Sequence, residues 1–136
     1  MASSLVDKTI GFIAVSYSIA LTVGSLVKPI AVKTTISNID KLLHLGAYFG
    51  LAILWLLYIH ILKLSLHRNW ASTKIYFGTA SLLIIYGIVI EVLQGSTTTY
   101  RTPDVWDVLA NTIGVILGSL LFMLLFKKFN GLKSYF

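Results

Sequence analysis

The stretch VWDVLANTIGVILGSLLFMLLF, residues 105–126, contains one charged side chain, Asp107, and is otherwise mostly apolar. At 1.5 Å per residue, a helix of this length crosses the hydrocarbon core of a bilayer, which is about 30 Å thick. Three more such runs lie at roughly residues 9–27, 42–62 and 75–94. The sequence therefore predicts an all-α membrane protein, an antiparallel bundle of four transmembrane helices that forms a single domain over residues 1–136.

The composition agrees with membrane insertion. Hydrophobic residues make up 57% of the chain and charged residues 12%, whereas a soluble domain carries about 25% charged residues. The apolar surface is too large for a water-soluble core of this size, and we expect membrane lipids to cover it. Cysteine is absent, which excludes disulfides, thiolate catalysis and Cys-type zinc sites.

The positive charge of the chain, +6 at pH 7, is placed as in a membrane protein. Lysine and arginine lie almost entirely between the apolar runs, and no basic cluster with interleaved aromatic residues predicts a nucleic-acid surface. With four spans, both termini and the middle connection share a side that holds seven of the eleven basic residues. The positive-inside rule then places both termini in the cytoplasm. Trp70 and Trp106 fall at the predicted interfaces.

The first run could alternatively be a cleaved signal peptide. Against this, Asp7 beside Lys8 leaves no net positive charge before it, and the run is longer than a typical signal-peptide core. We therefore expect the first run to remain as a transmembrane helix.

Polar residues gather at one end of three of these runs. In an antiparallel bundle these ends meet at the same side of the bilayer. A charge at the centre of a membrane helix costs about 2.5–3.5 kcal/mol on insertion scales, so such residues usually have a functional reason. The sequence predicts one polar site, formed by Asp40, Lys41 and His44 from the second run, Glu91 and Gln94 from the third, and Asp104, Asp107 and Asn111 from the fourth.

Helical periodicity places these polar residues on packing faces. At 100° per residue, Asp107, Asn111, Gly114 and Gly118 share a stripe, and a Gly-x-x-x-Gly pair lets another helix backbone approach closely. Similar stripes join polar ends to small or apolar residues on the other two helices: Asp40, His44, Ala47 and Leu51, flanked by Gly46 and Gly50, and Ala80, Ile84, Gly87 and Glu91.

Simpler roles exist for most of these residues. Asp40 and Asp104 could be helix caps. Thr102 followed by Pro103 is also a favourable helix start, with Pro103 in the first helical position and Asp104 near the positive end of the helix dipole. Lys41 could be an interfacial charge, and Asp107 and Asn111 could hydrogen-bond between helices. Glu91 is the hardest to explain in this way, because it lies neither at a cap nor near a favourable dipole end. It needs a partner or a proton.

Several chemistries remain open for this set. Asp40, His44, Glu91, Asp104 and Asp107 offer mixed nitrogen and oxygen ligands, but no fixed local spacing indicates a metal motif, so we predict no metal and no cofactor. A membrane enzyme would use Glu91 or Asp107 as general base with His44 as partner. A proton-coupled transporter would use Glu91 as the titrating group, and its small size predicts a homo-oligomer.

Three ordered motifs resemble the VanZ-like family of small bacterial membrane proteins. DKLLHLGAYF at residues 40–49 is similar to a family segment that begins Asp-Lys and ends Ala-Tyr, and EVLQ at residues 91–94 is similar to its Glu-x-x-Gln. RTPD at residues 101–104 and DVLANTIG at residues 107–114 are similar to its Arg- and Asp-containing segment. The resemblance covers about residues 40–118, and the first run matches only by hydrophobicity.

The resemblance implies a multi-pass plasma-membrane protein, and the founding member is associated with low-level resistance to the glycopeptide teicoplanin. We therefore expect an outward-facing pocket that engages a cell-envelope, amphiphilic or glycopeptide-type ligand, with a membrane enzyme or a transporter as alternatives. Lys41 and Arg101 would meet anionic groups. The remaining predicted ligand-binding residues are Asp40, His44, Tyr48, Glu91, Gln94, Asp104, Asp107 and Asn111.

Overall fold

The computed structural model describes residues 2–27, 39–66, 72–99 and 103–132, and these contain four helices and no strand. The helices are α1 (Ala2–Leu26), α2 (Ile39–Ser65), α3 (Ser72–Thr97) and α4 (Val105–Leu132). The predicted all-α fold is confirmed. Each helix is longer than its predicted run, because hydropathy marks only the part in lipid while backbone hydrogen bonding continues into the polar ends.

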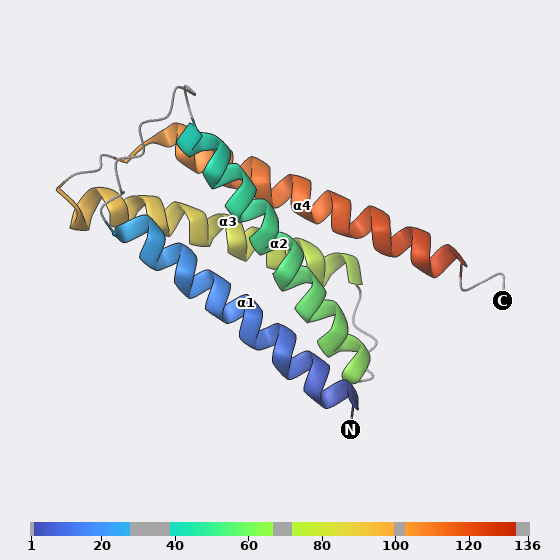
Figure 1. Ribbon diagram of the computed structural model, residues 1–136. Helices are drawn as coiled ribbons and strands as arrows, with labels where there is room; N and C mark the ends of the chain where they lie inside the picture. Colours follow the sequence, from blue (N-terminus) through green and yellow to red (C-terminus); the bar gives the residue numbers. More distant parts are fainter. Residues whose placement is uncertain (1, 28–38, 67–71, 100–102, 133–136) are drawn as a thin grey trace.

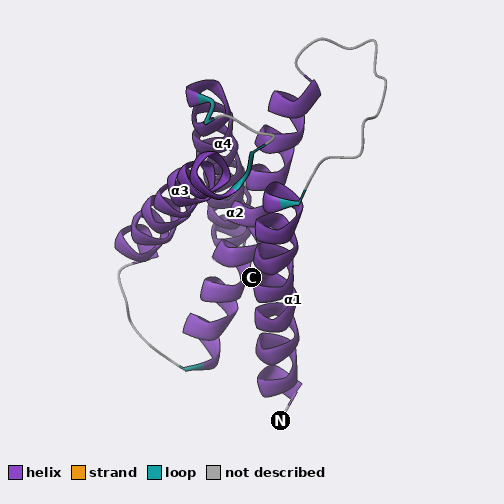
Figure 2. Ribbon diagram, turned by 90° about the vertical axis from the view of Figure 1, so that its left-hand side faces the viewer, coloured by secondary structure: helices purple, strands orange, loops and turns teal. Residues whose placement is uncertain are grey.

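Helix α2 is the centre of the arrangement. It contacts α1, α3 and α4, whereas the described parts of α1 and α4 do not contact each other. Figure 1 shows that successive helices run in opposite directions. The end of α1, the start of α2, the end of α3 and the start of α4 therefore lie at the same end of the molecule. Figure 2 shows the same four helices from the side. The polar ends identified in the sequence therefore share one end of the bundle.

Two glycines set the close approach of α4 to α2. A Cβ atom at Gly118 would lie 2.6 Å from the carbonyl oxygen of Phe49, and one at Gly114 would collide with the carbonyl oxygen of Leu45. Since backbone atoms cannot rotate away, only glycine fits at this distance. The predicted packing role of the pair is confirmed. Gly46 differs, because apart from its own stretch of α2 no atom of the described residues lies within 4 Å of a Cβ built there.

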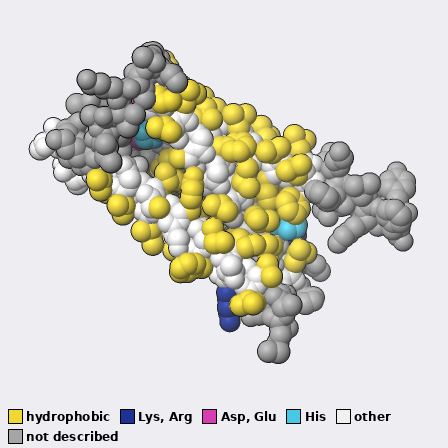
Figure 3. Space-filling model, in the orientation of Figure 1, with side chains coloured by type: hydrophobic (Ala, Val, Ile, Leu, Met, Phe, Trp, Pro, Cys, Tyr) yellow, Lys and Arg dark blue, Asp and Glu magenta, His cyan; other side chains and the backbone are white. Residues whose placement is uncertain are grey.

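Apolar side chains cover the outside of the bundle as well as filling it. Phe12, Leu82 and Leu124 are 73%, 68% and 66% exposed, although they lie in the middle of long helices. On the face shown in Figure 3, hydrophobic side chains cover the middle, and charged ones are seen only towards the ends. All four helices are long and apolar enough to cross a membrane. This exposure indicates a multi-pass membrane protein in a lipid environment.

Trp106 is 64% exposed in the first turn of α4, a position that suits an aromatic side chain at a membrane interface. Trp70 lies outside the described residues.

Hydrogen bonds hold α1 against its neighbours. The Tyr17 hydroxyl donates to the carbonyl oxygen of Ala47 in α2 (3.1 Å), and the Trp55 indole N–H donates to the Ser18 hydroxyl (3.0 Å). The Tyr86 hydroxyl in α3 donates to the Ser18 carbonyl oxygen (2.8 Å). Because lipid offers no competing water, such contacts help to decide which face of an apolar helix turns inward.

Candidate functional site

His44 stands at the meeting point of α2, α3 and α4. Its Nδ1 atom lies 3.1 Å from Oδ1 of Asn111 and 3.7 Å from Oε1 of Glu91, and its Nε2 atom lies 3.8 Å from Oδ2 of Asp107. These distances follow from the register of the helices, since His44 is just over one turn into α2, and Asp107 and Asn111 lie in the first two turns of α4. The structure thus brings together the acid, amide and imidazole groups of three helices.

The groups around His44 are hidden from solvent and lipid. Glu91 and Asn111 are each 2% exposed and Asp107 is 7% exposed. Buried carboxylates at these positions require compensating hydrogen bonds or countercharges, because an isolated ionised group is very costly in an apolar medium. Glu91 therefore faces the interior of the bundle and not the acyl chains.

Lys41 supplies much of the countercharge. Its Nζ atom lies 2.9 Å from Oδ2 of Asp104, 3.4 Å from Oδ1 of Asp107 and 3.8 Å from Oδ2 of Asp40. The lysine is thus shared among three carboxylates, and its charge is already engaged within the protein. The anionic groups that Lys41 meets in the described structure are thus carboxylates of the protein itself.

Asp104 also begins helix α4. Its Oδ1 atom accepts a hydrogen bond from the backbone N–H of Trp106 (2.9 Å), and its carbonyl oxygen accepts one from the N–H of Asp107 (3.0 Å). Asp104 is therefore the N-cap. The prediction of Pro103 as the first helical residue was wrong, since the proline precedes the cap. The hydrogen bond from the Lys41 ammonium has the largest effect on the pKa of Asp104, and the backbone N–H of Trp106 the next largest. Both hold this pKa below its usual range.

The other predicted residues form no hydrogen bond or ion pair with His44 in the part of the chain that the structure describes, or they lie outside that part. The Gln94 amide donates to the carbonyl oxygen of Ser25 in the last turn of α1 (2.7 Å). Tyr48 is 1% exposed in the apolar core, and its ring would lie 3.0 Å from a Cβ atom at Gly87. Asp40 is in the first turn of α2 and is partly exposed. Arg101 lies outside the described residues.

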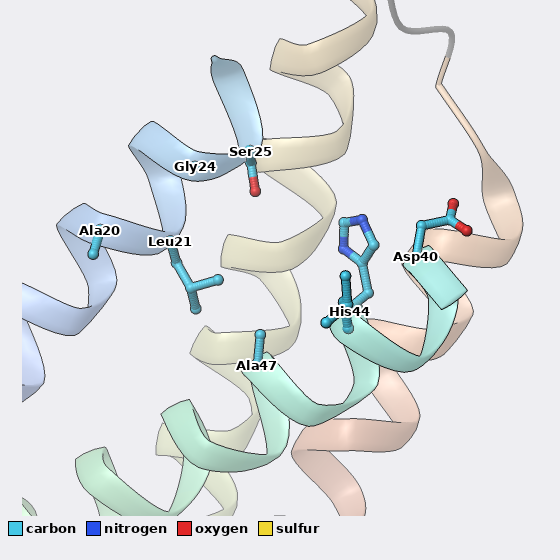
Figure 4. A pocket seen from close by; sticks show the side chains of 8 residues that line it. Ala20, Leu21, Gly24, Ser25, Asp40, His44 and Ala47 are labelled. Carbon is cyan, nitrogen blue, oxygen red and sulfur yellow. The ribbon is translucent and has the colours of Figure 1, made fainter. Parts of the chain in front are cut away.

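A cleft between α1 and α2 leads to this site. Its volume is about 210 Å³. Figure 4 shows the polar side chains of Ser25, His44 and Asp40 at one end of it, with the apolar side chains of Leu21 and Ala47 further along. The cleft is lined by Ala20, Leu21, Gly24, Ser25, Asp40, Leu43, His44 and Ala47. Its lining therefore changes from apolar to polar along its length.

The polar site carries an excess of negative charge. Among the described residues it holds four carboxylates and a single lysine, although the whole chain has a net charge of +6. A group of this kind attracts cations and hydrogen-bond donors.

Comparison with known proteins extends the resemblance seen in the three motifs. The VanZ/LLP1 family model matches residues 5–126. The chain belongs to the VanZ/LLP1 family. The match includes α1, which the motifs did not cover. Comparisons with curated proteins and with solved structures give no match.

Sequence reasoning missed the contribution of α1 to the site of this VanZ/LLP1 protein. Ser25 lines the cleft, and its carbonyl oxygen holds Gln94, while Ser18 and Thr22 hydrogen-bond with Tyr86. A signal was present, because residues 18, 22 and 25 follow the i, i+4, i+7 spacing of one helix face. Ser18, Thr22 and Ser25 are hydroxyl residues on one face of a helix that is otherwise mostly apolar.

Proposed function

We propose that this VanZ/LLP1 protein binds the polar end of an amphiphilic cell-envelope molecule in the cleft between α1 and α2. The observation that carries the proposal is the change of lining along the cleft, from Leu21 and Ala47 to Ser25 and His44. An acyl or prenyl chain suits the apolar part and a polar head suits the rest. The volume of about 210 Å³ is below the usual range for whole drug-sized ligands, about 300–1,000 Å³. It therefore fits only part of such a molecule.

The charge of the site selects the chemistry of the head group. Because Lys41 is engaged by three carboxylates, the site offers acceptors in excess. Hydroxyl and amine groups on the ligand satisfy such acceptors, whereas a phosphate would be repelled. A glycopeptide of the teicoplanin type and a glycosylated envelope lipid are the two sources of this chemistry that we propose to test.

We further propose that the protein resides in the plasma membrane with both termini in the cytoplasm, so that the site opens outward. The support is the bias of lysine and arginine towards the side with the termini. An outward opening gives the cleft access to envelope molecules in the outer leaflet.

A cleft-filling substitution tests the binding proposal. Gly24 lines the cleft and Gly78 does not. Among the described residues, neither has an atom from outside its own helix turn within 4 Å of a Cβ built there. Gly24→Leu should fill the cleft and lower tolerance to teicoplanin, or the binding of a fluorescent envelope lipid by the purified protein, at least tenfold. Gly78→Leu is the matched control and should have little effect. Equal behaviour of the two variants would argue against the cleft as the ligand site.

A second candidate function is a membrane enzyme acting on a lipid-linked envelope precursor. It is favoured by one observation, the position of His44 between Glu91 (3.7 Å) and Asp107 (3.8 Å). An imidazole flanked by carboxylates is suited to proton transfer. Turnover of such a precursor by the purified protein, abolished by His44→Gln, would establish the enzyme. Saturable binding without turnover would leave the binding function.

A further inference from the structure

We propose that His44, Glu91 and Asp107 together bind one divalent metal ion. Each residue comes from a different helix, α2, α3 and α4, and each offers one ligand atom. These three atoms all lie within 4.8 Å of one another. The proposal concerns the deep end of the polar site and does not depend on which amphiphile occupies the cleft.

The spacing suits a metal of ordinary size. Metal–ligand bonds of about 2.0–2.2 Å place neighbouring ligand atoms about 3–4 Å apart. Nδ1 of His44 lies 3.7 Å from Oε1 of Glu91, and the other ring nitrogen, Nε2, lies 3.8 Å from Oδ2 of Asp107. One metal ion takes only one of these nitrogens, and with one ligand atom from each residue all three atoms lie within 4.8 Å of one another. The three side chains are therefore close enough to share one ion after side-chain rotations that bring their ligand atoms closer together.

Asp107 divides its two oxygens between two partners. Oδ1 lies 3.4 Å from the Lys41 ammonium, whereas Oδ2 lies towards Nε2 of His44. Lys41 thus orients the carboxylate and leaves one oxygen for the metal. Such outer partners commonly fix the direction of a coordinating side chain.

Asn111 gives an independent indication of a ligand at this place. It is 2% exposed, and its Nδ2 atom has no hydrogen-bond partner within the described part of the chain. Its Oδ1 atom lies 3.1 Å from Nδ1 of His44. If Nδ1 donates this hydrogen bond, Nε2 keeps its lone pair and points it towards Asp107. The buried N–H₂ group beside it needs an acceptor, and an oxygen bound to the metal supplies one.

The charge of the site supports the same conclusion. Four carboxylates and one lysine leave three negative charges in the described site when the imidazole is neutral, and a divalent ion cancels two of them. One imidazole with two carboxylates and no sulfur ligand favours Zn²⁺ or Mn²⁺. Protonation of the carboxylates is the competing way to remove the charge, and the experiment separates the two.

Metal binding to the purified full-length protein tests the proposal. After removal of metal with a chelator, Zn²⁺ and Mn²⁺ are titrated separately, and bound metal is counted after gel filtration. One equivalent per chain is expected. Glu91→Gln and Asp107→Asn should each weaken binding by more than about 100-fold, beyond the 10–100-fold typical of losing an outer partner.

His60→Gln is the matched control, because His60 lies at the other end of α2 and pairs with Tyr76 (2.7 Å). It should bind metal as the wild type does. Should the site variants fail to fold, pulsed EPR of Mn²⁺ in the wild type still decides, since a ¹⁴N coupling from one imidazole is expected. Absence of bound metal, absence of that coupling, or equal loss in His60→Gln would overturn the proposal. Ligand binding that persists in chelator would leave the proposed function intact.

Discussion

Replacing Gly114 by alanine tests the packing that positions the polar site. The added Cβ atom would collide with the carbonyl oxygen of Leu45 and would lie 3.0 Å from the backbone nitrogen of Phe49. Both are backbone atoms of α2, so α4 must move away as a whole. Asp107 lies seven residues before Gly114 on the same helix, and the movement therefore also disturbs its contact with Lys41.

The size of the effect follows from a comparison with Gly46→Ala. An alanine at either position gains about 1 kcal/mol of helix propensity, which cancels between the two variants. A Cβ at Gly46 has no atom of another described helix within 4 Å, so Gly114→Ala carries the steric cost and Gly46→Ala does not. Overpacking costs about 1–3 kcal/mol. We expect Gly114→Ala to be less stable than Gly46→Ala by that amount.

The assay is reversible unfolding of both variants in the same detergent micelles, followed by helical circular dichroism. The free energy of unfolding is compared between the variants and the wild type. Equal stability of Gly114→Ala and Gly46→Ala would refute the close approach of α2 and α4.

Three further predictions concern α1, the helix cap and the orientation. Tyr86→Phe removes hydrogen bonds to α1 and should lower the free energy of unfolding by about 0.6–2 kcal/mol in micelles. The stability advantage of the wild type over Asp104→Asn should be constant above pH 3.8, the usual pKa, and disappear below it, because folding lowers this pKa. A pH-independent difference would contradict the pairing with Lys41. A cysteine at Thr99 should react with an impermeant reagent on intact cells and one at Leu66 should not; the reverse result would invert the orientation.

Much of the site could be predicted because its residues obey helical spacing. Asp107, Asn111, Gly114 and Gly118 share one stripe, and the structure uses that stripe against α2. The antiparallel order of four spans was enough to bring the polar ends to one side. The patterns of the second, third and fourth helices therefore indicated which face turned inward.

Other features depend on contacts that hydropathy does not record. The central position of α2, and the separation of α1 from α4 in the described residues, follow from side-chain contacts between helices. The motif named Tyr48 as a ligand-binding residue, and that stays a prediction, but hydropathy did not indicate that this tyrosine is buried in the apolar core. The predicted start of α4 at Pro103 was two positions early, because Asp104 caps the helix and Val105 is its first residue; the sequence alone does not distinguish a capping aspartate from one in the first turn.

The central claim is that a carboxylate of α3 and an imidazole of α2 meet inside the bundle. Glu91 is the only glutamate in the chain, so ¹³C-labelled glutamate marks a single carboxyl carbon. With ¹⁵N-histidine, the His60→Gln and His67→Gln substitutions leave His44 as the only labelled ring. Solid-state NMR in lipid bilayers should show a small but measurable through-space carbon–nitrogen dipolar coupling, because Oε1, which is bonded to the labelled carbon, lies 3.7 Å from Nδ1 of His44. No measurable coupling in a folded sample would contradict the account.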